Sequence, residues 1–406
     1  MPARRAATVF IFVLVVLDVL ALGIVIPVLP PLVVQFAGGD IQQGAAIYGL
    51  FGTAWALMQF VCSPVIGAIS DRYGRRPVLL LSCFGMAIDY VFMALAPTLV
   101  LLFIGRVISG ITASSFSTAG AYIADVTVPE KRAQAFGMMG AAFGVGFVIG
   151  PALGGVLGHL DPRLPFWVAG ALAFANAAYG FFILPESLPV EKRSPFIAWK
   201  KANPVGSLKL LRSHPELSGL AITYFLFQLA HYVLPSVAVL YASYRYGWNA
   251  QTMGLSLAAV GICNILVQAA LIKPAVAWLG ERGAMLTGLG FGVAGFAGYA
   301  LAPTGTAFMA VIPVFSLMGL FGPGVQAMMT RHVSASEQGQ LQGANTSLMG
   351  VAGLIGPFLF TLSFSHYIAA DRAFKLPGAP FFIAAGCLLC GAAIAAYSTR
   401  ARHAPA

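Results

Sequence analysis

Three charged residues, Asp18, Asp89 and Arg106, lie inside long runs of apolar residues. A carboxyl group in such surroundings can take up and release a proton, and a nearby guanidinium can stabilise its charged form. A lone charge in the middle of a bilayer costs at least about 2.5–3.5 kcal/mol, and residues placed there usually belong to a proton or substrate pathway. The three residues therefore predict proton transfer, and the alternative is a static ion pair that fixes helix packing.

The apolar runs predict a polytopic membrane protein with twelve helical spans. Of the 406 residues, 59% are apolar and 9% are charged, whereas soluble domains have about 45–50% and about 25%. About 20 apolar residues cross the bilayer as a helix. The first run is too long for a signal peptide and lacks a cleavage site. The expected spans are residues 8–34, 46–70, 77–97, 99–124, 133–158, 164–184, 217–243, 251–278, 284–303, 305–330, 340–366 and 379–399.

Basic residues predict the orientation and explain the net charge of +10. Eighteen of the 23 Lys and Arg residues fall on the side of the N-terminus, four fall on the other side and one, Arg106, lies within a span. Because basic loops stay in the cytoplasm, both termini are expected there, and the charge implies no nucleic acid. In this orientation Asp18 and Asp89 lie about 15–17 Å from the inner face, and Arg106 lies about 12 Å from the outer face. All three fall near one level of the bilayer.

Several Gly, Pro and Arg residues of the first half have counterparts in the second half, always at the sequence separation that relates Gly74 to Gly280. Two six-helix repeats around a central pathway are typical of a transporter. We expect an N-terminal bundle over residues 1–184, a cytoplasmic connector over 185–216 and a C-terminal bundle over 217–406. A capping box precedes the fifth span, at Thr127 with Glu130, and the eleventh, at Ser334 with Glu337. The matching positions are Gly74 and Gly280, Arg76 and Arg282, Gly137 and Gly343, and Gly150-Pro151 and Gly356-Pro357.

The stretch "SDRYGRRP" after the second span has the residues of a gate. Gly74 permits a tight reversal. Asp71 can cap a neighbouring helix N-terminus or pair with Arg75 or Arg132, and Asp125 offers a second carboxylate. Such pairs would close the inner side in one state and break in the other; the alternative is a basic loop that only sets topology. The expected gating residues are Gly67, Asp71, Arg72, Gly74, Arg75, Arg76, Asp125 and Arg132.

Small and polar residues within spans complete the candidate set. A glycine-rich face in the fifth span allows close helix approach, and it consists of Gly144, Gly150, Pro151, Gly154 and Gly155. Polar residues in other spans can hydrogen-bond a small-molecule substrate, although each could equally bond a neighbouring helix. The substrate candidates are Gln59, Gln228, His231, Asn264, Gln268, Gln326 and Asn345.

Several stretches resemble the major facilitator superfamily, over nearly the whole chain. "GAISDRYGRRPVLL" (residues 67–80) resembles the family's loop signature, and "GVGFVIGPALGG" (144–155) is similar to its antiporter signature. The stretches at residues 17–32, 105–137 and 244–261 resemble the tetracycline/proton antiporter branch. The resemblance implies an all-α polytopic fold of twelve transmembrane helices in two six-helix pseudo-symmetric bundles. It also implies that Asp18 and Arg106 face the pathway and that Asp89 matches the branch's acid in the third span.

By this resemblance the chain is expected to be a proton-coupled efflux antiporter that exports an amphiphilic drug by alternating access. A tetracycline-like compound, which could arrive as a metal chelate, suits the branch. The expected partners are the lipid bilayer, the small-molecule substrate and protons, with the proton as coupling ion and no other cofactor. The expected protein is a monomer in the bacterial inner membrane.

The C-terminal half departs from the branch. Asn264 stands where tetracycline exporters have a His, Ala294 stands near the position of an Asp, and His231 could replace this pair. The departure leaves open a proton symporter or facilitator for a small metabolite. An intramembrane enzyme is disfavoured because the sequence has no H-E-x-x-H and no G-x-S-x-G motif. The five cysteines lie within apolar runs, which favours packing over a metal site.

Overall fold

The computed structural model describes residues 2–113, 115–128, 131–196, 203, 206–334 and 337–399. Within these ranges the chain is helical, without strands, and eleven stretches are long and apolar enough to cross a membrane. One of them, Ala250–Leu301, has 52 residues. Its helix is broken at Gly280, where φ is 69° and ψ is 172°, so this stretch covers two crossings. The prediction of an all-α protein with twelve spans is confirmed.

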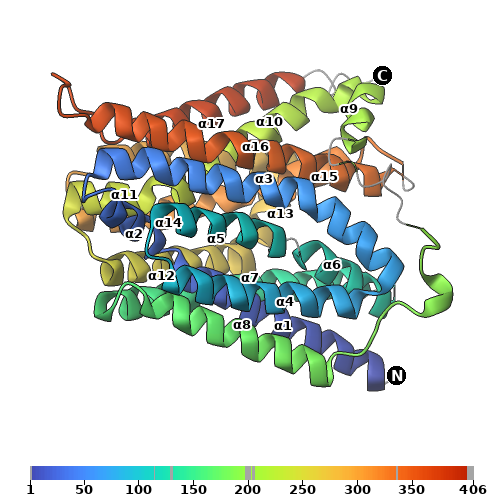
Figure 1. The fold of residues 1–406 in the computed structure, drawn as a ribbon. Helices are drawn as coiled ribbons and strands as arrows, with labels where there is room; N and C mark the ends of the chain where they lie inside the picture. Colours follow the sequence, from blue (N-terminus) through green and yellow to red (C-terminus); the bar gives the residue numbers. More distant parts are fainter. Residues whose placement is uncertain are drawn as a thin grey trace, which may run out of the picture. The chain divides into compact units, whose positions relative to one another are not determined.

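Eight helices form the first six crossings (Figure 1). Apolar runs form helices here because a helix satisfies its own backbone hydrogen bonds, which a bilayer cannot do. The helices are α1 (Pro2–Val25), α2 (Leu29–Phe36), α3 (Ile41–Tyr73), α4 (Arg75–Leu95), α5 (Leu99–Thr112), α6 (Ser115–Val126), α7 (Arg132–Leu160) and α8 (Leu164–Ile183).

The connector and the last six crossings follow. The connector contains the short elements η2 (Val190–Lys192), η3 (Gly206–Leu208), α9 (Lys209–Ser213) and η4 (Pro215–Leu217). The crossings are built from α10 (Ser218–His231), α11 (Val233–Tyr246), α12 (Ala250–Leu266), the π-helix η5 (Val267–Leu271), α13 (Ile272–Leu301), α14 (Gly305–Ser316), η6 (Leu317–Leu320), α15 (Phe321–Thr330), α16 (Gln338–Ile368) and α17 (Ala379–Ser398).

The first, fourth, seventh and tenth spans are interrupted helices. The interruptions lie at residues 26–28, after Thr112, at Tyr232 and at η6. Each interruption in the second half lies at the position that matches an interruption in the first half, at the same sequence separation as Gly74 and Gly280. The interruptions therefore follow the predicted repeat. Interrupted helices at membrane depth are tolerated where protein or water satisfies the freed backbone groups. The first and fourth of these spans carry Asp18 and Arg106, which the resemblance implies to face the pathway.

Backbone geometry supports the repeat at further positions. Gly74 and Gly280 both have positive φ, 106° and 69°. Thr98 and Thr304, which are separated by the same offset, cap α5 and α14 by accepting a backbone N–H with the side-chain hydroxyl. The predicted box at Ser334 is present in part: the hydroxyl and the N–H of this residue donate to Glu337 Oε2 over 2.6 and 3.0 Å. These bonds lower the pKa of Glu337. Its counterpart Glu130 lies outside the described residues.

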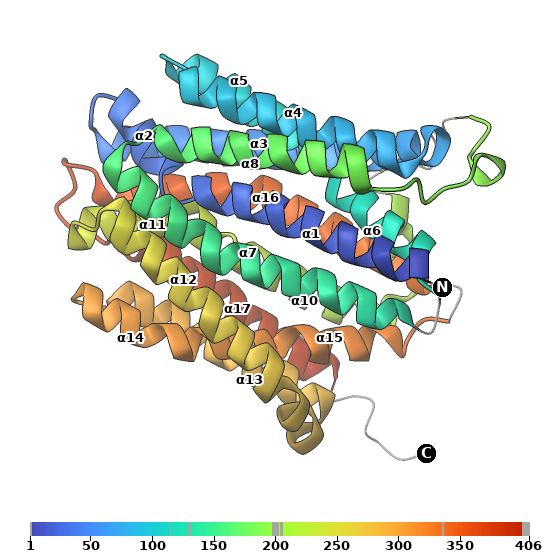
Figure 2. The same ribbon diagram turned by 90° about the horizontal axis from the view of Figure 1, so that it is seen from below.

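The chain packs as two compact units that interleave along the sequence. The first comprises Met1–Gly39, Ala54–Asn203 and Trp248–Gly261, and the second comprises Asp40–Thr53, Pro204–Gly247 and Ile262–Ala406. Helices α3 and α12, which occupy matching places in the repeat, each pass from one unit to the other. The division at residues 184 and 217 stays a prediction. Within the first unit α1 packs along α7 and α8, and α4 packs along α8 (Figure 2).

Candidate functional site

The carboxyl group of Asp18 is enclosed in the core of the first unit. The residue is 1% exposed, and apolar side chains of α1, α4 and α6, including Leu14, Val19 and Leu79, form the cluster around it. Its Oδ1 accepts a hydrogen bond of 2.8 Å from Asn176 Nδ2 of α8. The thiol of Cys83 on α4 lies 3.8 Å from the same oxygen. Asp18 is therefore a buried acid held by uncharged donors.

Asn176 is a functional candidate that the sequence prediction missed. It is fully buried, and its Nδ2 also donates to the backbone carbonyl of Leu14 over 2.9 Å. It thus spans one turn of α1, because Leu14 and Asp18 are four residues apart on one face. The available signal was an amide in the apolar run 164–184, since a buried amide needs a hydrogen-bond partner.

Asp89 and Arg106 meet between α4 and α5. Asp89 is 1% exposed and lies so close to α5 that a Cβ built on Gly105 would be 3.3 Å from its Oδ1. Neither oxygen of Asp89 has a hydrogen-bond partner within the described part of the chain. The guanidinium of Arg106 stands 5.5 Å from the ring centre of Trp55. Asp89 thus accepts no hydrogen bond from Arg106, and Asp18 is held by Asn176 and Cys83.

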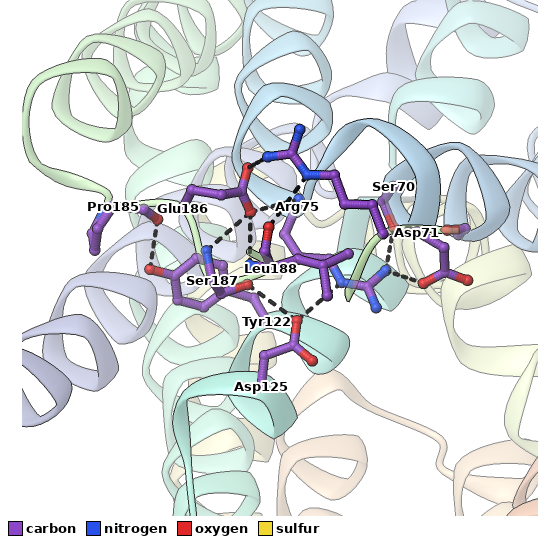
Figure 3. A network of polar contacts seen from close by, with 11 residues as sticks. Ser70, Asp71, Arg75, Tyr122, Asp125, Pro185, Glu186, Ser187 and Leu188 are labelled. Atoms are coloured by element: carbon purple, nitrogen blue, oxygen red, sulfur yellow. Dashed lines mark hydrogen bonds and ion pairs between the residues drawn. The ribbon is translucent and has the colours of Figure 1, made fainter. Parts of the chain in front are cut away.

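The expected gating loop forms a compact polar cluster around Arg75 (Figure 3). The guanidinium of Arg75 contacts Asp71 Oδ1 at 2.6 Å, Asp125 Oδ2 at 3.1 Å and Ser70 Oγ at 2.6 Å. Its side chain is 10% exposed, whereas that of Asp71 is 53% exposed. The cation is therefore buried by its acceptors, one of which remains open to solvent.

The other expected gating residues lie around this cluster. Arg76 donates to the carbonyl of Phe181 at the end of α8, and Arg72 stacks over Tyr73. Within the described residues, a Cβ built on Gly67 would have no contact within 4 Å beyond its own helix backbone and its chain neighbours. The side chain of Arg132 lies outside the described residues, so its pairing with Asp71 stays a prediction.

Glu186 of the connector, which the sequence prediction missed, caps α4. Its Oε1 accepts the backbone N–H of Arg75 over 2.9 Å and those of Ser187 and Leu188 over 2.9 and 3.0 Å. A carboxylate at this place stabilises the positive end of the helix. Gly74 makes the approach possible, because a Cβ there would overlap Glu186 Oε2. Asp71 therefore pairs with Arg75, and the cap that it could have formed comes from Glu186.

More of the connector docks on the same cluster. The side chain of Ser187 donates to Asp125 Oδ2 over 3.1 Å, and the N–H of Ser194 donates to the carbonyl of Asp71 over 2.9 Å. Tyr122 OH donates to the carbonyl of Pro185 over 2.9 Å. One indication of these contacts is present in the sequence: the connector begins directly after α8, so its first residues must lie near the end of that helix.

The second half carries the same ion pair with its charges exchanged. Glu281 and Arg331 occupy the positions that match Arg75 and Asp125 in the repeat, and Arg331 Nη2 lies 2.7 Å from Glu281 Oε1. In the first half the cation, Arg75, lies at the start of α4 and the anion, Asp125, lies near the end of α6. Each charge therefore interacts unfavourably with the dipole of its own helix. In the second half both charges agree with the dipoles. The first pair is therefore the less stable arrangement for isolated helices.

The glycine-rich face of α7 packs against α1 beside Asp18. A Cβ on Gly150 would be 2.8 Å from the Cα of Gly23, and one on Gly154 would overlap the carbonyl of Ile24. Gly146, rather than the half-buried Gly144, continues this contact. Pro151 lies within α7, and Gly155 faces α12, where a Cβ would be 3.0 Å from the Cα of Gly254.

The substrate candidates are only partly brought together, and all but Gln59 lie in the second unit or at its edge in α12. Asn345 Nδ2 donates to Gln326 Oε1 over 3.3 Å. His231 stacks on Phe227, which stacks on Phe321 with ring centres 3.9 Å apart. The remaining candidates lie on separate elements: Gln59 on α3, Gln228 on α10, Asn264 on α12 and Gln268 in η5, with Ala294 exposed on α13.

Known proteins similar to this chain point to one family. The sequence matches the model of the Major Facilitator Superfamily over residues 11–357. It is 40% identical over 347 residues to the class C tetracycline resistance protein of Escherichia coli, covering 86% of this chain and 87% of that protein. It is 38% identical over 364 residues to the class G protein of Vibrio anguillarum, covering 89% and 91%.

Solved structures share the fold. The human organic anion transporter MFSD10 (TETRAN) has a TM-score of 0.72 at 25% identity, covering 97% of this chain and all of that chain. The nucleoside transporter NupG has a TM-score of 0.76 at 13% identity, covering 97% and 99%, which is a likeness of fold alone. With the family model and the relatives in agreement, the chain belongs to the major facilitator superfamily and is an integral membrane transporter, not an enzyme.

Proposed function

We propose that this transporter is a proton-coupled antiporter that exports a tetracycline-like amphiphilic drug across the bacterial inner membrane, with both termini in the cytoplasm. The relatives named tetracycline resistance proteins support the substrate class. The observation that carries proton coupling is Asp18, an acid 1% exposed in an interrupted span. The proposal takes the protein to act as a monomer, with no cofactor besides the coupling proton.

Proton binding changes the energy of burying this site. An ionised carboxylate in the membrane interior is costly, whereas its protonated form is cheaper to enclose. A state that seals the site is therefore favoured after proton uptake, and a state open to water is favoured after release. The protein alternates between these states and carries drug out of the cell in one half of the cycle and protons into the cell in the other. The flux of drug is thereby coupled to the flux of protons. Asp89, a second buried acid beside Arg106, contributes in the same way.

The Arg75 cluster serves as the gate on the cytoplasmic side. Its contacts join α3, α4 and α6 and the start of the connector. Contacts of this kind hold a set of helix ends together until the acceptors are exchanged for water. The cluster thus stabilises the state in which it is intact, and the transport cycle requires that it open.

The test uses everted membrane vesicles with an acidic interior. Tetracycline with Mg²⁺ and a panel of amphiphilic drugs are added, and the pH gradient is followed by fluorescence. We expect drug to dissipate the gradient in wild type and in the control Asp371→Asn, which changes an exposed loop acid. No dissipation is expected in Asp18→Asn or Asp89→Asn at equal membrane abundance. Normal exchange in both variants would remove the proposed roles of these acids.

A second candidate function rests on Asn264 and Ala294. These residues leave the second unit without the titratable pair of tetracycline exporters, which favours a proton symporter or facilitator for a small metabolite. The same vesicles distinguish the two functions. A metabolite carrier would leave the gradient unchanged with every drug, and a symporter would instead acidify right-side-out vesicles when its metabolite is supplied outside.

A further inference from the structure

We propose that Asn176 is a positioning residue that fixes the orientation of Asp18 and stabilises its ionised form. The inference rests on the proposed role of Asp18 as a proton site. It starts from one nitrogen, Asn176 Nδ2, which lies 2.8 Å from Asp18 Oδ1 and 2.9 Å from the carbonyl oxygen of Leu14. The amide has two hydrogens on this nitrogen, one for each acceptor.

The backbone of α1 prevents the amide from turning over. If its oxygen and nitrogen exchanged places, the amide oxygen would face the Leu14 carbonyl and the Asp18 carboxylate, which are both acceptors. The Leu14 carbonyl therefore keeps an N–H directed at Asp18 Oδ1. A proton that arrives at Asp18 is left with the other oxygen, Oδ2, whose polar neighbour is the Cys83 thiol at 4.0 Å.

The amide favours one protonation state because the strength of its hydrogen bond depends on charge. A hydrogen bond to an ionised acceptor is roughly twice as strong as one to a neutral acceptor. Asn176 therefore stabilises ionised Asp18 more than protonated Asp18. In an apolar core this support keeps the deprotonated state accessible, so that the proton can leave again during the cycle.

Other titratable groups around Asp18 are few. Cys83 and Tyr90 of α4 and Tyr122 of α6 are those packed about it in the described part of the chain. On the side of α7 the side chains packed against the cluster are those of Met139 and Phe143, which do not titrate, and α8 contributes Asn176. None of these neighbours is a cation, so the amide is the donor best placed to support a negative charge.

Replacing the amide by an apolar side chain of similar size tests the proposal. In purified protein reconstituted in lipid, the infrared absorption of protonated Asp18 is isolated as the difference between each protein and its Asp18→Asn version, and is followed against pH. In Asn176→Leu we expect the protonated carboxyl band to persist about one pH unit higher than in wild type, a tenfold change in the equilibrium constant. An unchanged titration would overturn the proposal.

A matched control separates positioning from packing. Thr223 of α10 is also fully buried, and its hydroxyl lies 2.8 Å from the carbonyl oxygen of Gly219 in the same helix and 3.2 Å from that of Gly391 on α17. Thr223→Val removes this buried hydrogen-bonding hydroxyl from the second unit, which does not contain Asp18, so it should lower thermal stability without moving the Asp18 band. An equal shift in this control would show a general effect of loosened packing and would overturn the assignment to Asn176.

Two further measurements keep the test decisive. If Asn176→Leu does not insert, Asn176→Ser, whose hydroxyl is too short to serve both acceptors, should move the band in the same direction; an unmoved band would count against the proposal. The infrared titration needs no transport substrate. Failure of drug–proton exchange in wild type would therefore refute the proposed function alone, whereas intact exchange with an unmoved band in the variants would refute the role of Asn176 alone.

Discussion

Single residues show which parts of the site were predictable. Asp18 and Asp89 stand out in the sequence because a charge in an apolar run is conspicuous at any position. Asn176 and Glu186 do not, since their importance lies in which atoms they contact across the fold. Leu14, Gly74 and Arg75 become their partners only once helices far apart in sequence are packed.

Gly74 allows a prediction at this scale, with Gly67 as its matched control. Gly74→Ala should lower thermal stability, because the backbone of Gly74, with φ 106° and ψ 158°, costs an L-residue about 1–3 kcal/mol and the new methyl would meet Glu186. Gly67→Ala lies in the interior of α3 with open space around it, so it should leave stability unchanged or raise it. Melting curves of the two purified variants check this; equal melting temperatures would contradict the role given to Gly74.

At the scale of elements, hydropathy predicted where helices cross but not where they are interrupted. The spans matched because a run of about 20 apolar residues is long enough to cross the bilayer as a helix wherever it occurs in the chain. The interruption at residues 26–28 contains Pro27, which has no backbone N–H to donate, and the N–H groups of Ile26 and Val28 donate to carbonyls three residues earlier. Hydropathy does not register such a break, because the residues around it are all apolar. The docking of the connector on α4 could not be foreseen for another reason, since its partners Gly74 and Arg75 lie far from it in sequence.

The connector supplies the second prediction. Glu186→Gln should destabilise the protein by about 1 kcal/mol, the usual effect of losing a favourable helix cap. It should also slow the proposed drug-driven proton exchange, because the state in which the proposed gate is closed, which the cycle must revisit, becomes less stable. Glu191→Gln, an exposed acid in the same connector, should change neither quantity. Melting temperature and initial rates in vesicles measure both effects. Normal values in Glu186→Gln would show that the capping contact is incidental.

At the scale of the whole molecule, the two repeats keep the backbone and exchange the charges. Positive φ at Gly74 and Gly280 preserves the same reversal, while the pairs built on it, Arg75 with Asp125 and Glu281 with Arg331, have opposite polarity. The repeat was visible in the spacing of Gly, Pro and Arg. The exchange of charge was not, because it requires knowing which side chains pair.

Reversing the charges of the second pair tests this asymmetry. Glu281→Arg alone places two cations together and should lower stability. Adding Arg331→Glu restores an ion pair but sets both charges against the helix dipoles, each interaction being about 0.3–1 kcal/mol. The double variant should therefore recover only part of the loss in melting temperature. Full recovery would mean that the dipoles contribute nothing at this place.

The contact between α1 and α7 has a mechanical consequence. At Gly150 and Gly154 the two helices meet backbone to backbone, and at Gly146 the backbone of α7 contacts the side chain of Val19. Such a surface offers little resistance to small shear displacements, in which packed helices slide past one another. The helix that carries Asp18 can thus shift along α7 at a small energetic cost. We expect that replacing Gly146, Gly150 and Gly154 one after another by alanine slows the transport cycle more with each replacement. The affinity for drug should stay unchanged.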